Sequence, residues 1–165
     1  MAAPPHLWAL SDSEINNYFK NSKLYLGTYA KDEIPMLADA MAKRKRGAMV
    51  INMGDIDTGG THWVAILMYP KMTIYFDSFG CEPPKQVLAF MQQRKVLSFY
   101  CDRQLQDLSS SSCGWFCIFM IEQCVSDKRD ILDVIPLFTF DTAQNERILR
   151  DSFFGKRTPT FGFPK

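Results

Sequence analysis

The chain has 165 residues, of which 47% are hydrophobic and 22% charged, a balance typical of a folded protein and not of a disordered one. Its formal net charge of +1 excludes a strong general attraction to nucleic acid or membranes, so any such binding requires a local patch. At this length we expect one domain over residues 1–165, with residues 156–165 as a loosely held tail.

The first predicted helix begins after Ser11. Ser11 and Glu14 have the spacing of a capping box, in which each side chain bonds the other residue's backbone N–H. Ile15, Tyr18 and Phe19 follow at helical spacing. We therefore expect a short helix with these three side chains on one face.

A second helix is predicted after an extended or turn segment over residues 24–29. Pro35 suits the first turn of a helix, which we expect to run through about Ala42. The four basic residues 43–46 complement a helix C-terminus, and Gly47 suits the C′ cap. The same basic run is also compatible with a nuclear-import signal or a phosphate-contacting patch.

Apolar runs predict the strands. Residues 48–53 form a short buried strand, followed by a loop over residues 54–60. Residues 63–69 are continuously apolar, β-branched and aromatic, which indicates a central strand covered on both faces. After a turn near residues 70–71, residues 72–76 return as the next strand.

This hairpin predicts a meeting of His62 and Asp77. Residues that face each other across an antiparallel pair have a constant index sum. A tight turn at Tyr69-Pro70 gives the sum 139, which His62 and Asp77 share. The two residues would then be direct cross-strand neighbours, although a turn one residue later would shift the register by two.

Beyond the hairpin, residues 83–84 introduce a helix that ends near Arg94, with Val87, Leu88 and Met91 facing inward. The remaining predicted elements are a strand over residues 96–100 and helices over residues 113–121, 130–135 and 142–153. Asp141 or Thr142 can cap the last helix, and Ile148 and Leu149 lie on its buried face.

Cys113 occupies the position that a nucleophile needs. A polar run, residues 106–112, stops at this cysteine, and an apolar segment of about three helical turns follows. Unpaired N–H groups and the helix dipole favour a thiolate there. On its own, however, a cysteine in this place is more often a small buried hydrophobe.

Three further residues supply the other parts of cysteine acyl-transfer chemistry. His62 can take the thiol proton and then protonate the leaving amine, and Asp77 can orient its imidazole. Gln106 can donate a side-chain N–H to the developing oxyanion beside the backbone N–H of Cys113, with the serine run 109–112 as a flexible link. Gln104 competes for this role, but its spacing to the cysteine favours it less.

A metal site is the competing hypothesis. Cys113, Cys117 and Cys124 fall near one helical face. The sequence offers no second ligand cluster, so we expect neither a metal nor a cofactor.

The cysteines and the start of the chain predict a compartment. The first six residues lack the basic and apolar regions of a signal peptide, and no apolar run is long enough to span a bilayer. Five scattered cysteines, an odd number, fit free thiols in a reducing compartment. We therefore expect a protein of the cytoplasm or nucleus that is neither secreted nor bound to a membrane.

Four ordered motifs resemble those of the adenovirus-type endopeptidases (adenain), within the clan that includes the SUMO-deconjugating proteases. Residues 59–63 resemble Gly-Gly-x-His-Trp, and residues 77–80 resemble acidic-x-Phe-Gly. Residues 106–117 are similar to Gln-x6-Cys-Gly-x-Phe-Cys, and residues 26–29 to Leu-Gly-Thr-Tyr. The resemblance covers roughly residues 15–125. Papain-type enzymes have the cysteine before the histidine, so this chain is not one of them.

The resemblance implies a viral endopeptidase that matures capsid and core precursors at Gly-Gly or Gly-x-Gly sites, acts as a monomer and is packaged in the virion. It implies an α+β fold with a mixed, mainly antiparallel sheet packed on the helix that carries Cys113. Gly60, Trp63 and Gly114 would contact the substrate.

Several departures limit what can be carried over. The acid is Asp77 where adenovirus enzymes often have Glu, the hairpin is shorter by two residues, and the chain is shorter after Cys113. Those enzymes are activated by a short peptide, through a disulfide, and by DNA. The spacing of Cys101 does not match their cysteine, so the activating disulfide is not carried over. A net charge of +1 does not support activation by DNA, for which residues 43–46 are the one candidate contact.

Three other functions fit parts of the pattern. A deconjugase of ubiquitin-like modifiers would use the same four residues on a Gly-Gly C-terminus. An acetyltransferase of the bacterial-effector type would need an acetyl-CoA site, for which we see no feature. An inactive interaction domain would be expected to have lost at least one of the four.

Overall fold

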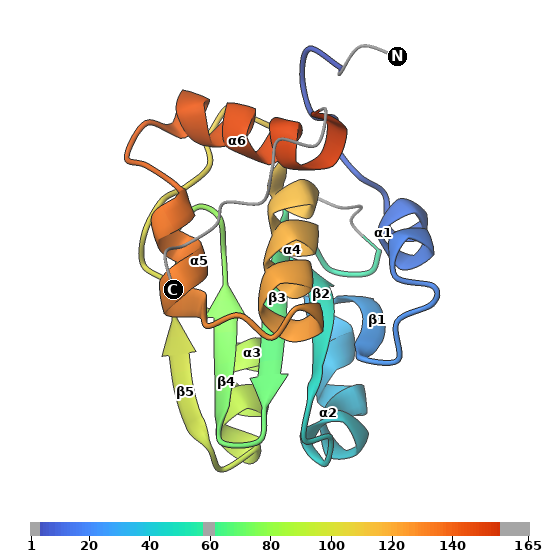
Figure 1. Cartoon of the computed structure of the whole chain (residues 1–165). Coiled ribbons are helices and arrows are strands. Elements are labelled where there is room, and N and C mark those ends of the chain that lie inside the picture. The colour runs from blue at the N-terminus through green and yellow to red at the C-terminus, as the bar shows by residue number, and fades with distance from the viewer. Residues whose placement is uncertain (1–3, 58–61, 156–165) are drawn as a thin grey trace.

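The computed structural model describes residues 4–57 and 62–155, which form a five-stranded sheet in the order β1-β2-β3-β4-β5 (Figure 1). The strands are β1 (Tyr25–Ala30), β2 (Gly47–Asn52), β3 (Trp63–Tyr69), β4 (Met72–Phe76) and β5 (Leu97–Tyr100). The two central pairings, β2 with β3 and β3 with β4, are antiparallel. The two edge pairings, β1 with β2 and β4 with β5, are parallel.

Two parallel neighbouring strands need a crossover connection, and in each edge pair a helix provides it. Helix α2 (Ile34–Ala42) connects β1 to β2, and α3 (Lys85–Gln93) connects β4 to β5. Both helices cover one face of the sheet, where they pack on Met49, Ile66 and Tyr75.

Helix α4 (Cys113–Ile121) covers the opposite face, and all nine of its residues are buried (Figure 1). The sheet thus has helices on both faces, which explains why β3 is a continuous apolar run. The predicted α+β fold, with a mixed sheet packed on the helix that carries Cys113, is confirmed.

The other helical segments surround α4. They are α1 (Asp12–Tyr18), η1 (Lys31–Glu33), the π-helical η2 (Glu122–Ser126), α5 (Ile131–Val134), η3 (Ile135–Leu137) and α6 (Thr142–Phe154). Trp115 of α4 contacts Trp8 and Phe153 edge-on, with ring centroids 4.8 and 4.9 Å apart. These aromatic contacts join α4 to the segment before α1 and to the end of α6.

Local signals in the sequence located most helix starts and strand ends. The capping box of Ser11 and Glu14 is present, and Asp141 caps α6 by accepting from the Gln144 N–H. The bounds predicted for β3 and β4 are those observed.

Three local predictions were wrong. Gly47 does not cap α2 but opens β2, because α2 ends at Ala42 with Lys43 as its C-cap and residues 43–46 form an exposed connection. Tyr18 is 42% exposed, since its hydroxyl reaches out to Glu122 at 2.7 Å. Leu88 is also exposed, because Val87, Phe90 and Met91 form the inward stripe of α3.

The predicted hairpin register was also wrong. The last pair of the ladder is Tyr69 with Met72, so the turn is Pro70-Lys71. The residue numbers of each observed pair, such as Ala65 and Phe76, add up to 141. Continued by one pair, this register places Asp77 beside Val64, two residues from His62.

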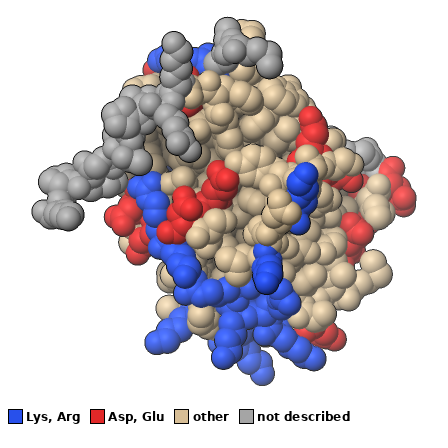
Figure 2. All heavy atoms as spheres, turned by 45° about the vertical axis from the view of Figure 1, so that its right-hand side comes forward, with Lys and Arg blue, Asp and Glu red and all other residues tan. Residues whose placement is uncertain are grey.

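Two predictions lie outside the described residues: the role of Gly60 and the loose tail over residues 156–165. Within the described residues, no helix is long and apolar enough to cross a membrane. The basic run 43–46 lies where α2 ends, and Figure 2 shows Lys and Arg gathered at that end of the molecule.

Candidate active site

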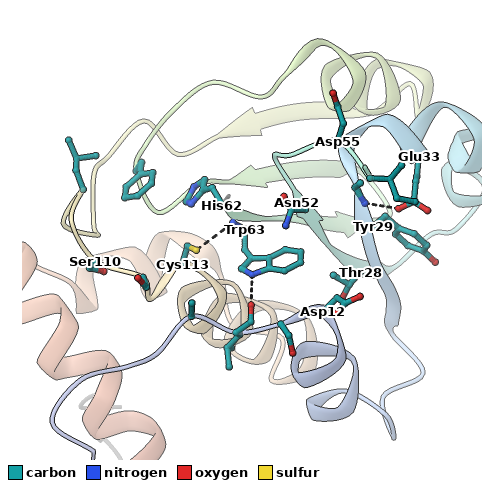
Figure 3. Close-up of a pocket in the computed structure, with 18 residues that line it drawn as sticks. Asp12, Thr28, Tyr29, Glu33, Asn52, Asp55, His62, Trp63, Ser110 and Cys113 are labelled. Carbon is teal, nitrogen blue, oxygen red and sulfur yellow. Dashed lines mark hydrogen bonds between the residues drawn. The ribbon is translucent and has the colours of Figure 1, made fainter. Parts of the chain in front are cut away.

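Cys113 is the first residue of α4, and its side chain lies at the helix N-terminus. The residue is 8% exposed, and its Sγ accepts the backbone N–H of Trp63 at 3.5 Å. Helix N–H groups and the positive end of the dipole stabilise negative charge at this position. Figure 3 shows Cys113 beside His62 at the start of β3, with the Trp63 indole turned away from both.

His62 lies directly before β3, between Asp77 and Cys113. Its Nε2 is 2.7 Å from Asp77 Oδ1, which leaves Nδ1 as the ring nitrogen that can exchange a proton with Cys113. Burial lowers the pKa of His62, but hydrogen bonds to Asp77 and Cys113 and the negative charge of both groups outweigh it and raise the pKa to about 9. At neutral pH the imidazole of His62 is therefore protonated.

The tight turn after β4 holds both Asp77 and the imidazole. Asp77 Oδ1 also accepts the Phe79 N–H at 2.8 Å, and the Phe79 ring stacks on His62 with centroids 4.3 Å apart and planes at 16°. The Gly80 N–H closes the turn on the Asp77 carbonyl at 2.8 Å. A Cβ at Gly80 would lie 2.8 Å from the carbonyl oxygen of Asp102, so the turn has no room for a side chain there.

The structure thus brings His62, Asp77 and Cys113 together, as the sequence predicts, although by a different register. Sequence reasoning gave Phe79 no role. The motif over residues 77–80 contained the signal, because a stacked aromatic ring two residues after the acid fixes the plane of the base.

Gln106 is fully buried, but it is not hydrogen-bonded to Cys113. Its Oε1 accepts from Ser78 Oγ at 2.6 Å, and its Nε2 donates to the carbonyl and hydroxyl oxygens of Ser110, each at 3.0 Å. Gln104 is exposed and donates to the Gln106 carbonyl at 2.9 Å, outside the site. The oxyanion role of Gln106 therefore stays a prediction.

The serine run 109–112 is hydrogen-bonded, where the sequence had suggested a flexible link. Ser110 and Ser112 both donate to Glu146 of α6, and Ser109 donates to Asp107. No local pattern pointed to Glu146, because its partners lie 34 and 36 positions earlier in the chain.

A cleft of about 910 Å³ runs along the site (Figure 3). His62, Trp63 and Cys113 line one part of it, together with Ser110 and Ser111. Residues 9–12, the end of β1 and the end of β2 line another part. The Trp63 indole N–H is fixed by the Leu10 carbonyl at 2.8 Å.

Gly114 is not among the residues that line this cleft, and its contact with substrate stays a prediction. A Cβ at Gly114 would lie 3.1 Å from Leu10 Cβ and 3.3 Å from Trp63 Cδ1. The glycine instead lets Leu10 and Trp63 pack closely against the start of α4.

The other cysteines are free thiols of a different character. Cys117 and Cys124 are fully buried, and burial raises the pKa of Cys117 strongly and that of Cys124 to about 12. Cys81 is exposed, and partial burial together with the charge of Asp77 raises its pKa. The described part of the chain holds no group of three His, Cys, Asp or Glu side chains that could bind a metal.

Two curated relatives are adenovirus proteases. The chain is 30% identical over 118 residues to the protease of Bovine adenovirus B serotype 3, a match over 61% of this chain and 56% of that protein. It is 27% identical over 120 residues to the protease of Bovine adenovirus 2, over 64% of this chain and 57% of the relative. The resemblance predicted from the four motifs is confirmed, although the chain spans little more than half the length of these relatives. No family model matches the chain.

Solved structures show the same fold at low sequence identity. The ASFV pS273R protease superposes with a TM-score of 0.62 at 17% identity, over 96% of this chain and 72% of that one. The Ulp1 protease domain superposes with a TM-score of 0.51 at 14% identity, over 90% of this chain and 76% of that one. It was solved in complex with SMT3, the yeast ortholog of SUMO.

Proposed function

We propose that the chain is a cysteine endopeptidase with Cys113 as nucleophile, His62 as acid and base, and Asp77 as the residue that orients His62. The observation that carries the proposal is the 2.7 Å bond from His62 Nε2 to Asp77 beside a cysteine at a helix N-terminus. The similarity to adenovirus proteases supports the same assignment.

The proposed reaction starts from this arrangement. Cys113 Sγ attacks the carbonyl carbon of the scissile bond, and the oxygen becomes an oxyanion that the Cys113 N–H binds, with the Gln106 amide as the predicted second donor. His62 passes its proton to the amine as the C–N bond breaks. A water then attacks the thioester, His62 takes the water's proton, and release of the carboxylic acid restores the cysteine.

The relatives suggest the substrates. We propose viral precursor proteins cleaved at Gly-Gly or Gly-x-Gly sites, since both relatives are viral proteases. A deconjugase is the second candidate, because the fold is shared with a protease solved in complex with the yeast ortholog of SUMO.

A peptide library incubated with the wild type, Cys113→Ala and the control Cys81→Ala tests the proposal. Cleavage after glycine by the wild type and Cys81→Ala, and none by Cys113→Ala, is expected. Hydrolysis that persists in Cys113→Ala would refute the nucleophile. Processing of ubiquitin-like precursors without cleavage of Gly-x-Gly-Gly peptides would move the function to deconjugation.

A further inference from the structure

One carboxylate of α6 holds two hydroxyl groups next to the nucleophile. Ser110 Oγ donates to Glu146 Oε1 at 2.6 Å, and Ser112 Oγ donates to the same oxygen. Ser112 is the residue directly before Cys113 and the N-cap of α4. Glu146, far away in the sequence, thereby contacts both ends of the short segment 110–112, which leads directly into the helix of the nucleophile.

The first consequence concerns the N-terminus of α4. A serine at the N-cap ordinarily accepts a hydrogen bond from the backbone N–H two or three residues on. Ser112 makes no such bond, and its hydroxyl is turned to Glu146 instead. The N–H of Gly114 consequently has no acceptor among residues 4–57 and 62–155, and the N–H of Cys113, the first residue of the helix, has none there either. They remain available to a developing negative charge.

The second consequence concerns Gln106. The Gln106 Nε2 donates to two oxygens of Ser110, each at 3.0 Å, and Glu146 anchors Ser110. The fully buried Asn145, the residue before Glu146, donates to the carbonyl of Leu105, the residue before Gln106, at 3.0 Å. Two successive residues of α6 thus fix the backbone before Gln106 and the acceptor of its amide.

We propose that Glu146 is a positioning residue for the oxyanion site. It anchors Ser110, and with it Gln106, and it keeps the Ser112 hydroxyl off the N-terminus of α4. Without the carboxylate, the Ser110 hydroxyl, at 2.9 Å, is the remaining partner of the Ser112 hydroxyl in the described residues. Ser112 can then turn to cap the helix, where its oxygen competes with the substrate oxyanion. The inference rests on the proposed peptidase activity.

Steady-state cleavage of a glycine-site peptide by Glu146→Ala, Glu146→Gln and the control Arg147→Ala tests this role. Loss of a single oxyanion donor costs about 10²–10³-fold in kcat, so partial misplacement should cost Glu146→Ala about 10-fold or more, with KM changed by less than about 2-fold. Glu146→Gln keeps an acceptor oxygen and should retain most activity. Arg147 is exposed on the same helix and makes no hydrogen bond to the serine run among the described residues, so it should tolerate alanine.

Alkylation of Cys113 by iodoacetamide separates positioning from a folding defect, because displacement at sulfur builds no oxyanion. The alkylation rate should be the same in Glu146→Ala and the wild type. Adding Ser112→Ala to Glu146→Ala should restore part of kcat, since no hydroxyl is left to cap α4. Ser110→Ala keeps the carboxylate and the Ser110 carbonyl but removes the hydroxyl that links Gln106 to Glu146, and it should lower kcat without lowering Tm.

An unchanged kcat in Glu146→Ala or in Ser110→Ala would overturn the proposal, as would an alkylation rate that falls in step with kcat. A wild type that hydrolyses no peptide would refute the proposed function itself. An active wild type with an equally active Glu146→Ala would refute only the role of Glu146.

Discussion

At the scale of the residue, the site depends on how firmly His62 is held. Asp77 bonds the edge of the imidazole and Phe79 covers its face. The sequence indicated His62, Asp77 and Cys113 because each stands at the end of a strand or the start of a helix, where a local pattern changes. It gave no sign of Glu146, because a carboxylate in an amphipathic helix looks like any solvated residue until its distant partners are known.

Replacement of Asp77 by Asn tests the orienting role. The wild-type kcat/KM should fall as pH rises through about 9, because His62 then loses the imidazolium proton that protonates the leaving amine. Asp77→Asn removes the charge that helps to raise this pKa. The falling limb should therefore move to lower pH, and kcat/KM at pH 7 should drop about 10²-fold or more.

Asp39→Asn is the control for this measurement, since Asp39 binds Gln93 far from the site. A pH profile of Asp77→Asn that superposes on the wild type would show that Asp77 does not orient His62.

At the scale of the element, the hairpin explains why a wrong register still led to a correct contact. The observed index sum of 141 replaces the expected 139, so the residue beside Asp77 shifts from His62 to Val64. A shift of two keeps the same face, whereas a shift of one would have moved His62 to the other side of the sheet. The sequence left the position of the turn open, because Tyr69-Pro70 and Pro70-Lys71 both suit a tight turn. Either turn places His62 on the same face of the sheet as Asp77.

The turn over residues 77–80 gives an element-scale prediction. Gly80 has φ +74°, and its missing Cβ would lie 2.8 Å from the backbone of Asp102 and Arg103. Gly80→Ala should therefore destabilise the fold by about 1–3 kcal/mol and lower kcat, because the turn carries Asp77 and Phe79. Urea unfolding and peptide cleavage measure the two effects, and Cys81→Ala, the exposed neighbour, should change neither. A fully stable Gly80→Ala would contradict the close approach.

At the scale of the whole molecule, the site lies where three elements meet on one side of a two-faced sheet. β3 begins there, β4 ends there, and the buried α4 begins between α1 and α6 (Figure 1). The sequence predicted the buried central strand and the buried helix from their apolar runs. It did not predict which helices cover which face, nor that α6 packs on α4, because contacts such as that of Trp115 with Phe153 leave no local periodicity.

The whole fold should become less stable as the histidine loses its proton. The folded-state pKa of His62, about 9, lies above its ordinary value of 6.5. The stabilisation from its pairing is therefore complete below pH 6.5 and is lost as pH rises through about 9. The free energy of unfolding in urea should fall more between pH 6 and pH 9.5 for the wild type than for Asp77→Asn. Equal falls in both proteins would show that the pair contributes no stability.

Site-resolved alkylation tests the central assignment most directly, because accessibility and activation point to different cysteines. Limiting iodoacetamide at pH 7, followed by mass spectrometry of each cysteine peptide, compares the buried Cys113 with the exposed Cys81 in the wild type and in His62→Ala. We predict that Cys113 reacts faster than Cys81 in the wild type and that His62→Ala removes this advantage while leaving Cys81 unchanged. A faster reaction at Cys81, with a Cys113 rate that does not respond to His62→Ala, would contradict the assignment of Cys113 as the activated nucleophile.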